Sequence, residues 1–252
     1  MNFNYDSYGG FLNHLRDGGY AFVDYFNWRD KKRCVILRHD VDFDIIKAHR
    51  LALFERDAGV ISTYFVIITS DFYNVFASKN VILLKEIVNA GHKIGLHFDE
   101  MQYPKIIGDI EAIKKQILWE AKILSEAIGE KIRTVSMHRP SKAILDADIS
   151  IPGIENSYSK TYFKDFKYLS DSRRWWREPV EEIIEGRKYD RLHILTHAFW
   201  YQDDELDLYS CIKGFVNRGN WHRYMTMNDN FTNLAEVMPE NEVDGIRGAG
   251  VW

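Results

Sequence analysis

The sequence contains few cysteines and no long apolar run. Its two cysteines, Cys34 and Cys211, lie far apart, so they form neither a metal-ligand set nor a disulfide framework. No apolar run approaches the ~20 residues that a membrane-spanning helix needs. The N-terminal stretch MNFNYDSYGGFLNHLRDGGY lacks the basic start and apolar centre of a secretory signal. We therefore expect a cytoplasmic protein without a transmembrane segment.

The sequence also lacks an excess of basic residues. Its 33 lysines and arginines face 37 acidic residues, which gives a net charge of −4. This balance offers no electrostatic reason to expect nucleic-acid binding. A low-complexity linker and a sequence repeat are missing as well. With 252 residues, 46% of them hydrophobic, the composition is that of an ordinary globular protein, and we expect a single domain over residues 1–252.

Short runs rich in β-branched and aromatic residues alternate with segments of helical periodicity. The runs predict strands at Cys34–Arg38, Ser62–Ile68, Lys93–Phe98, Arg133–His138, Ser159–Phe163, Tyr168–Ser170 and Leu192–Thr196. The periodic segments predict helices at Ile45–Ala58, Val81–Ala90 and Ile106–Ile128, each followed by a glycine. This alternation is typical of an α/β protein with a parallel sheet, and seven strands suggest a barrel or partial barrel. Residues 203–240 predict additional C-terminal helix, and the last nine residues, DGIRGAGVW, predict a loose tail.

The strand Cys34–Arg38 leads into a cluster of charge, RHDVD. Side chains alternate along an extended backbone, so Asp40 and Asp42 should point to the same side. Two carboxylates that face one pocket repel each other unless a cation or a proton lies between or beside them. A divalent metal, Arg38 or a proton would each satisfy this need. The alternative is a surface turn with solvated carboxylates.

Three further predicted strands end in imidazole or guanidinium groups. These are His97, then His138 with Arg139, and then His197. Each has an ordinary structural explanation, such as a hydrogen-bonded histidine or a surface arginine. Parallel α/β folds, however, place their chemistry at the carboxyl ends of the strands. Taken together, these groups supply the metal ligands, the free base and the acid that metal-assisted activation of water requires.

Five motifs in a fixed order resemble those of a known family. They are RHDVD, GHKIGLHF, HRP, YLSDSRRWW and ILTHAFWY, within residues 33–201. They resemble the polysaccharide deacetylase superfamily, also called the NodB-homology group or carbohydrate esterase family 4, and most of all its WbmS-like branch, which is found with surface-polysaccharide biosynthesis. The resemblance implies a distorted (β/α)7 barrel. It also implies a metal-dependent hydrolase that removes acyl groups, usually acetyl, from amino sugars.

The resemblance assigns the metal ligands and the base. Asp40 would be the general base and Asp42 a metal ligand. His97 would be the first member of a histidine pair, but the second falls at Met101, which cannot replace a histidine. The third ligand could then be His138, Asp99 or a water, or there could be none. We favour His138, because it also ends a strand.

The remaining motifs supply the other expected site residues. Arg139 would hold the base, Asp171 would orient a catalytic histidine, and His197 would be that histidine, the general acid. The expected substrate contacts are Trp175 and Trp176, which would wall the acyl pocket, together with Leu195 and Trp200.

The resemblance also implies a cofactor and a class of partner. We expect a divalent metal, Zn²⁺ first, with Mn²⁺, Co²⁺ or Ni²⁺ as alternatives. The expected partner is an amino sugar or glycan, with a nucleotide-linked or lipid-linked precursor as one form. One alternative is a deformylase, and another is an inactive barrel that binds a carbohydrate or a partner enzyme, which Met101 favours. An unrelated phosphoesterase or amidohydrolase ranks last, because the sequence has neither a glycine-rich phosphate loop nor an HxH pair.

Overall fold

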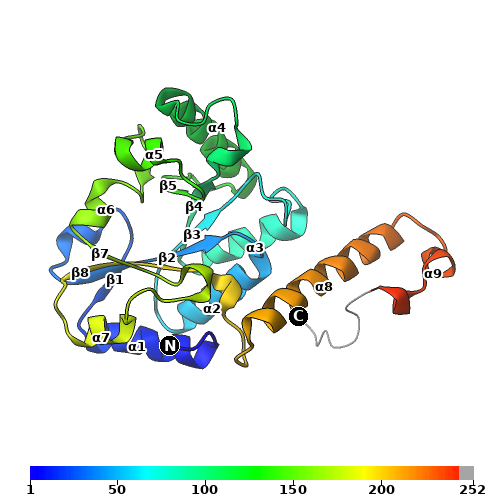
Figure 1. The fold of residues 1–252 in the computed structure, drawn as a ribbon, viewed down its shortest axis with the longest axis horizontal. Helices are drawn as coiled ribbons and strands as arrows, with labels where there is room; N and C mark the ends of the chain where they lie inside the picture. Colours follow the sequence, from blue (N-terminus) through cyan, green and yellow to red (C-terminus); the bar gives the residue numbers. More distant parts are fainter. Residues whose placement is uncertain (244–252) are drawn as a thin grey trace. The chain divides into compact units, whose positions relative to one another are not determined.

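A parallel sheet forms the centre of residues 1–203. The computed structural model describes residues 1–243 of the chain. Its strands are β1 (Ala21–Val23), β2 (Cys34–Val41), β3 (Thr63–Val66), β4 (Lys93–Phe98), β5 (Thr134–Met137), β6 (Glu155–Asn156), β7 (Lys167–Ser170) and β8 (Arg191–Thr196). They follow the order β6-β5-β4-β3-β2-β8-β7, and β1 pairs with β2. The sheet is an open half-barrel with helices around it (Figure 1), so the expected distorted α/β barrel is confirmed.

Strand β2 is the most enclosed strand of the sheet. One edge pairs with β8 over Cys34–His39, while the other pairs first with β1 and then, from Arg38 onward, with β3. All eight of its residues are buried, including Arg38, His39 and Asp40. Buried charged groups are costly unless they are paired and hydrogen-bonded. The charged end of this strand must therefore carry a set of internal partners.

Helices cover the sheet and connect its strands. In residues 1–203 they are α1 (Tyr5–Asp17), α2 (Ile45–Asp57), α3 (Ser78–Asn89), α4 (Ile110–Ile128), α5 (Lys142–Ala147), α6 (Lys160–Lys164) and α7 (Val180–Glu185), with short 3-10 turns η1 (Trp28–Asp30), η2 (Glu100–Gln102), η3 (Ser172–Arg174) and η4 (Ala198–Trp200). Helix α2 begins three residues after Asp42, because the Asp44 side chain accepts hydrogen bonds from the Ile46 and Lys47 amides. This cap turns the chain sharply away at the carboxyl end of β2.

A cluster of mostly aromatic side chains packs around β1, β2 and β3. This buried cluster contains Val23, Tyr25, Trp28, Cys34, Ile36, Phe65, Tyr162 and Phe166. Burying each large apolar side chain contributes roughly 1.5–3 kcal/mol. The Arg38 guanidinium lies over the Phe65 ring of this cluster, so the cluster reaches the charged end of β2.

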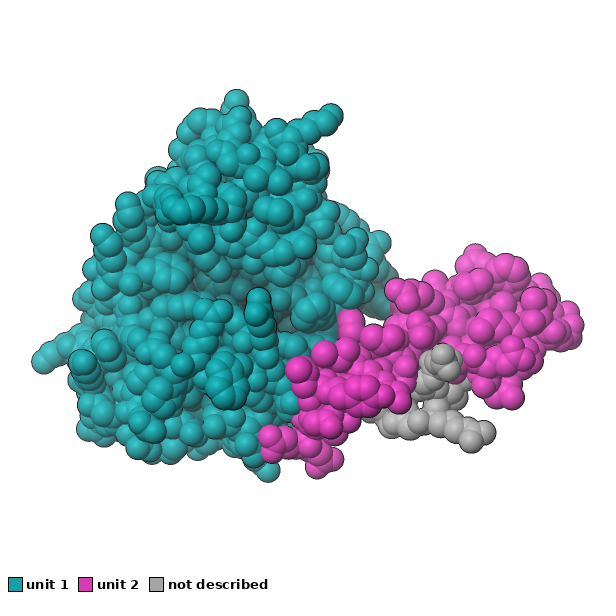
Figure 2. Space-filling view, viewed as in Figure 1, with its two compact units in different colours: residues 1–203 teal, residues 204–252 magenta. Residues whose placement is uncertain are grey.

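The chain divides into two compact units, residues 1–203 and 204–252 (Figure 2). In the second unit the structure describes α8 (Leu208–Asn228), α9 (Leu234–Val237) and η5 (Glu240–Glu242), so the expected additional helix is present. Tyr224, Leu234 and Val243 form its small apolar cluster. The single domain over residues 1–252 stays a prediction, since compact packing does not measure independent folding. The expected tail, residues 244–252, lies outside the described residues.

One predicted strand needs correction, and two short strands were not predicted. Ser159–Phe163 is not a strand, because residues Lys160–Lys164 form the one-turn helix α6. Its aromatic content reflects packing, since Tyr162 is buried and its hydroxyl donates to Glu155 at 2.7 Å. The short strands β1 and β6 were not predicted, because two or three residues carry too little periodicity to indicate a strand. No helix within residues 1–243 is long and apolar enough to cross a bilayer.

Candidate metal centre and catalytic residues

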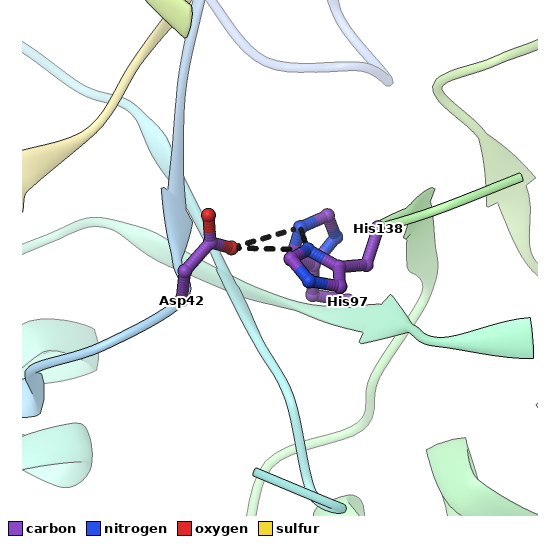
Figure 3. A group of neighbouring side chains, drawn as sticks. All are labelled: Asp42, His97 and His138. Carbon is purple, nitrogen blue, oxygen red and sulfur yellow. Dashed lines mark hydrogen bonds and ion pairs between the residues drawn. The ribbon is translucent and has the colours of Figure 1, made fainter. Parts of the chain in front are cut away.

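Three side chains from separate strands meet at the carboxyl edge of the sheet (Figure 3). Asp42 follows β2, His97 belongs to β4 and His138 follows β5. Asp42 Oδ1 lies 3.2 Å from His97 Nε2 and 3.3 Å from His138 Nδ1, and the two nitrogen atoms are 3.3 Å apart. A tetrahedral Zn²⁺ site with ligands at ~2.0–2.1 Å separates neighbouring ligand atoms by about 3.3 Å. The three atoms therefore already stand at the spacing that a tetrahedral cation requires.

The three atoms contact one another, and His97 is held through its other ring nitrogen. His97 Nδ1 lies 3.3 Å from the Ser136 carbonyl oxygen, which can only accept, so in the neutral ring this nitrogen carries the hydrogen and Nε2 keeps its lone pair. That lone pair faces a carboxylate, a contact that repels without a cation or proton between the two. Asp42 Oδ1 is buried without a hydrogen-bond partner of its own among the described residues. A histidine held through its other ring nitrogen by a backbone carbonyl is typical of metal ligands.

The charge of Asp42 also suits a cation. Burial alone raises the pKa of this carboxyl, but the His138 and His97 imidazoles beside it hold the pKa well below its ordinary value. Asp42 is therefore ionised at neutral pH. One carboxylate and two imidazoles form a ligand set that suits Zn²⁺ and related divalent ions. The residues present thus fit a divalent metal.

Asp40 lies beside this centre and has a different partner. Its Oδ2 accepts a hydrogen bond from an Arg38 terminal nitrogen at 2.7 Å and lies 3.4 Å from His97 Nε2. Its Oδ1 is buried and has no hydrogen-bond partner within residues 1–243. One oxygen is therefore held by a permanent cation, while the other is left to accept a proton.

Arg38 is the buried cation beside Asp40, which the sequence left as one of three alternatives. Its side chain is fully buried, and it also donates to the Ser136 hydroxyl at 2.7 Å and to the Ser157 hydroxyl at 2.8 Å. The guanidinium lies over the rings of Phe65 and Tyr158. The available signal was an arginine inside an apolar strand, two residues before Asp40 and therefore on the same side of the strand.

His197 and Asp171 form a buried pair on the other side of Asp42. His197 Nδ1 lies 2.6 Å from Asp171 Oδ1, and the His197 amide donates to Asp171 Oδ2 at 3.1 Å. The second ring nitrogen, Nε2, points to Asp42 Oδ2 at 3.7 Å. Burial alone lowers the pKa of His197, but the Asp171 carboxylate raises it to about 9. The imidazole is thus oriented by Asp171 and presents Nε2 to the centre.

Arg139 does not lie where the resemblance placed it. Its guanidinium pairs with Asp99, and Arg38 is the partner of Asp40 instead. Met101 lies in η2, 38% exposed, and His138 stands where a third ligand is needed. The physical reason is reach, because Arg139 follows β5 in a loop while Arg38 lies within the sheet, on the same strand as Asp40.

The expected substrate contacts lie in different surroundings. Trp175 follows η3 and is 69% exposed, whereas Trp176 packs on Phe11 of α1 with ring centroids 5.9 Å apart. Leu195 is buried within β8. Trp200 is buried with its ring centroid 6.5 Å from that of His197. Trp200 thus has its ring beside that of a catalytic candidate, while Trp175 and Leu195 bond to Asp171 through their backbones.

Comparisons with known proteins place the fold. No family model and no curated protein matches the chain. A carbohydrate esterase family 4 (CE4) esterase from Streptococcus mutans aligns with a TM-score of 0.50 and 14% identity, covering 84% of this chain and 91% of that chain. The catalytic domain of a peptidoglycan N-acetylglucosamine deacetylase from Eubacterium rectale aligns at 0.44 with 13% identity, covering 75% and 84%. A CE4 family pseudoenzyme from Bacillus anthracis aligns at 0.43 with 17% identity, covering 75% and 62%.

These similarities concern the fold. The chain spans 62% to 64% of the length of the pseudoenzyme and its mutants. At these identities a shared fold does not carry a shared activity, which has to be argued from the site.

Proposed function

We propose that this chain is a metal-dependent amide hydrolase of the polysaccharide deacetylase superfamily, in its WbmS-like branch. It would remove an N-acyl group, acetyl in the first instance, from an amino sugar used in surface-polysaccharide biosynthesis. The ordered motifs and the fold shared with the Streptococcus mutans esterase support the superfamily. We retain the cytoplasm as its proposed location and a nucleotide-linked or lipid-linked sugar as a proposed form of the substrate.

One observation carries the proposal. Asp42, His97 and His138 place three ligand atoms 3.2–3.3 Å apart, beside a base candidate on one side and an acid candidate on the other. A protein that only binds a glycan has no need for such a pair. A divalent cation bound there would supply the Lewis acidity that acidifies water and polarises an acyl carbonyl.

The residues of the chain would divide the proton transfers between them. Asp40, held by Arg38 through Oδ2, accepts the proton of the attacking water, which is the role of a general base. His197 donates a proton from Nε2 to the leaving amine, which is otherwise too basic to depart. Asp171 holds the imidazole so that Nε2 faces the centre. Trp200 lies beside the imidazole and would contact the substrate.

Two rival functions follow from other features. A deformylase would use the same residues on a smaller acyl group, so only the substrate distinguishes it. An inactive barrel was favoured by Met101, which leaves the expected histidine pair incomplete. His138 weakens this argument, because its ring nitrogen supplies the third ligand atom beside those of Asp42 and His97.

Metal content and product release test the proposal together. The purified full chain should bind about one equivalent of Zn²⁺ and release acetate from N-acetyl amino sugars. Asp42→Asn should bind less than about a tenth of an equivalent. Asp44→Asn is the matched control, because Asp44 caps α2 and asparagine caps a helix equally well. Formate released from N-formyl sugars alone would favour the deformylase, and a chain that takes up no metal would favour the inactive barrel.

A further inference from the structure

The buried carboxylate of Glu55 lies apart from the proposed catalytic groups. Glu55 belongs to α2 and has no exposed surface. Burial alone raises the pKa of its carboxyl, but His39 and other neighbours lower the pKa to about 2, so the group is ionised. A buried carboxylate is costly unless its oxygens are fully hydrogen-bonded.

Four side chains satisfy the Glu55 carboxylate. Oε1 accepts from the Tyr8 hydroxyl at 2.6 Å and from His39 Nε2 at 2.8 Å. Oε2 accepts from the Ser62 hydroxyl at 2.6 Å and from the Tyr64 hydroxyl at 2.7 Å. These donors come from α1, β2, the start of β3 and β3 itself. Glu55 therefore ties two helices to the strands of the sheet.

One of these donors, His39, also forms a hydrogen bond to a residue of β8. Because the carboxylate can only accept, His39 carries its hydrogen on Nε2 and, in the neutral ring, accepts through Nδ1. Nδ1 lies 2.5 Å from the Thr196 hydroxyl oxygen. His39 and Thr196 are partners in the register of β2 and β8. A side-chain bond thus locks two strands at one pair of residues.

The bond between His39 and Thr196 lies next to both proposed catalytic residues. His39 immediately precedes Asp40, and Thr196 immediately precedes His197. Alternation along a strand places His39 and Thr196 on the face opposite to their catalytic neighbours. Any change in the spacing of His39 and Thr196 is therefore transmitted, through one peptide unit on each strand, to the separation of Asp40 and His197.

We propose that the chain Glu55–His39–Thr196 is a positioning network that fixes the general base and the general acid at their working distance. This inference rests on the proposed function, since it assigns Asp40 and His197 those two roles. Displacing a catalytic group by about 1 Å can cost on the order of 100-fold in rate. The network lies on the face of the sheet opposite to Asp40 and His197. It would prevent their displacement without contacting substrate or metal.

Thr196→Val is the sharpest test, because valine keeps the shape of threonine and removes the hydroxyl. The matched control is Tyr64→Phe, which removes a hydroxyl from the same carboxylate. Tyr64 lies on β3, which pairs with β2 and β4 but not with β8, so this change leaves the His39–Thr196 bond between β2 and β8 in place. Both variants lose a buried hydrogen bond, so both should lower the melting temperature. We expect kcat of Thr196→Val to fall by about tenfold or more, with KM and zinc affinity within about twofold of wild type. Thr196→Ser should restore kcat, and Tyr64→Phe should keep it.

A second readout does not depend on turnover. The proton between His197 Nδ1 and Asp171 should give a downfield NMR resonance whose position follows the geometry of that bond. It should shift in Thr196→Val and stay in place in Tyr64→Phe. If both variants lose stability alike while kcat and the resonance stay at wild-type values, the network is only structural and the inference is overturned. If wild-type protein cleaves no amino-sugar amide, the proposed function fails, and the resonance alone decides whether Thr196 positions His197.

Discussion

Asp40 and Asp42 lie two residues apart, yet their surroundings suit them to different roles. Asp42 faces two imidazoles, whereas Asp40 has one oxygen on Arg38 and one without a hydrogen-bond partner in the described part of the chain. Asp40→Asn removes the proton acceptor but keeps the shape of the side chain. We expect kcat to fall by about 10²–10⁴-fold, the usual contribution of a general base. Zinc affinity, measured by competition with a chelator, should stay within a few-fold of wild type, and near-normal kcat would exclude Asp40 as the base.

Arg38 and Arg139 offer a direct comparison of a buried and an exposed arginine. Arg38 is fully buried on Asp40, while the Arg139 side chain is 54% exposed on Asp99. Removing one partner of a buried ion pair costs roughly 3–5 kcal/mol, and an exposed pair contributes about 0–1 kcal/mol. Arg38→Met should therefore lower the free energy of unfolding in urea by several kcal/mol, and Arg139→Met by less than about 1 kcal/mol. If both variants lose the same free energy of unfolding, the ion pair of Arg38 with Asp40 is not the buried, stabilising pair described here.

Residue types and spacing predicted which groups gather at the site better than they predicted how those groups pair. Alternation along the strand placed Asp40 and Asp42 on one side, and strand ends placed His97, His138 and His197 near them. Pairing depends on the reach of each side chain in three dimensions. Alternation left Arg38 as one of three ways to satisfy the carboxylates, but spacing alone could not choose between them, and the resemblance assigned the pairing with the base to Arg139.

At the scale of elements, β4 has little room beside its neighbours. A Cβ added at Gly95 would lie 2.5 Å from the Phe65 ring and 2.6 Å from the Thr134 hydroxyl oxygen. His97 follows two residues later on the same face of the strand. Gly95→Ala should therefore lower the free energy of unfolding by about 1–3 kcal/mol and also weaken zinc binding, because β4 must shift.

Gly10→Ala is the control for that substitution. Gly10 lies within α1, and a Cβ there meets nothing within 4 Å. The change should stabilise the protein by about 0.5–1 kcal/mol and leave zinc binding unchanged. Calorimetry of both variants with and without zinc makes the comparison. A Gly95→Ala protein as stable as wild type would show that β4 has more room than the contacts indicate.

The strongly patterned elements were predicted from sequence, and the weakly patterned ones were not. Helix α2 and the buried strands β2, β4 and β8 match their predicted segments closely, because apolar runs and caps define them. Helix α6 was mistaken for a strand, since five residues hold too little periodicity to separate the two. Strand order was not predicted, because hydrophobic pattern gives the faces of a strand but not its neighbours.

For the whole molecule, the Glu55 network predicts how stability depends on pH. The pKa of Glu55 is lowered from its ordinary 4.5 to about 2, mainly by His39 acting against the effect of burial. A depressed carboxyl pKa contributes stability above the unfolded pKa, and this contribution is lost as pH falls toward the folded pKa. Between about pH 6 and about pH 3 the loss should be on the order of 2 kcal/mol. Urea unfolding of metal-free wild type and metal-free Glu55→Gln measures this loss. The difference between their free energies of unfolding should become smaller as the pH falls from about 6 to about 3. A difference that does not change with pH would contradict the ionised state of Glu55.

The account as a whole depends on one cation joining three strands. A crystal of the zinc-loaded full chain, measured on both sides of the zinc absorption edge, tests this most directly. We predict one anomalous peak within about 2.0–2.2 Å of Asp42 Oδ1, His97 Nε2 and His138 Nδ1. A crystal of zinc-treated protein with no peak between these atoms, or with a peak held by other residues, would contradict the metal centre and the hydrolase built on it.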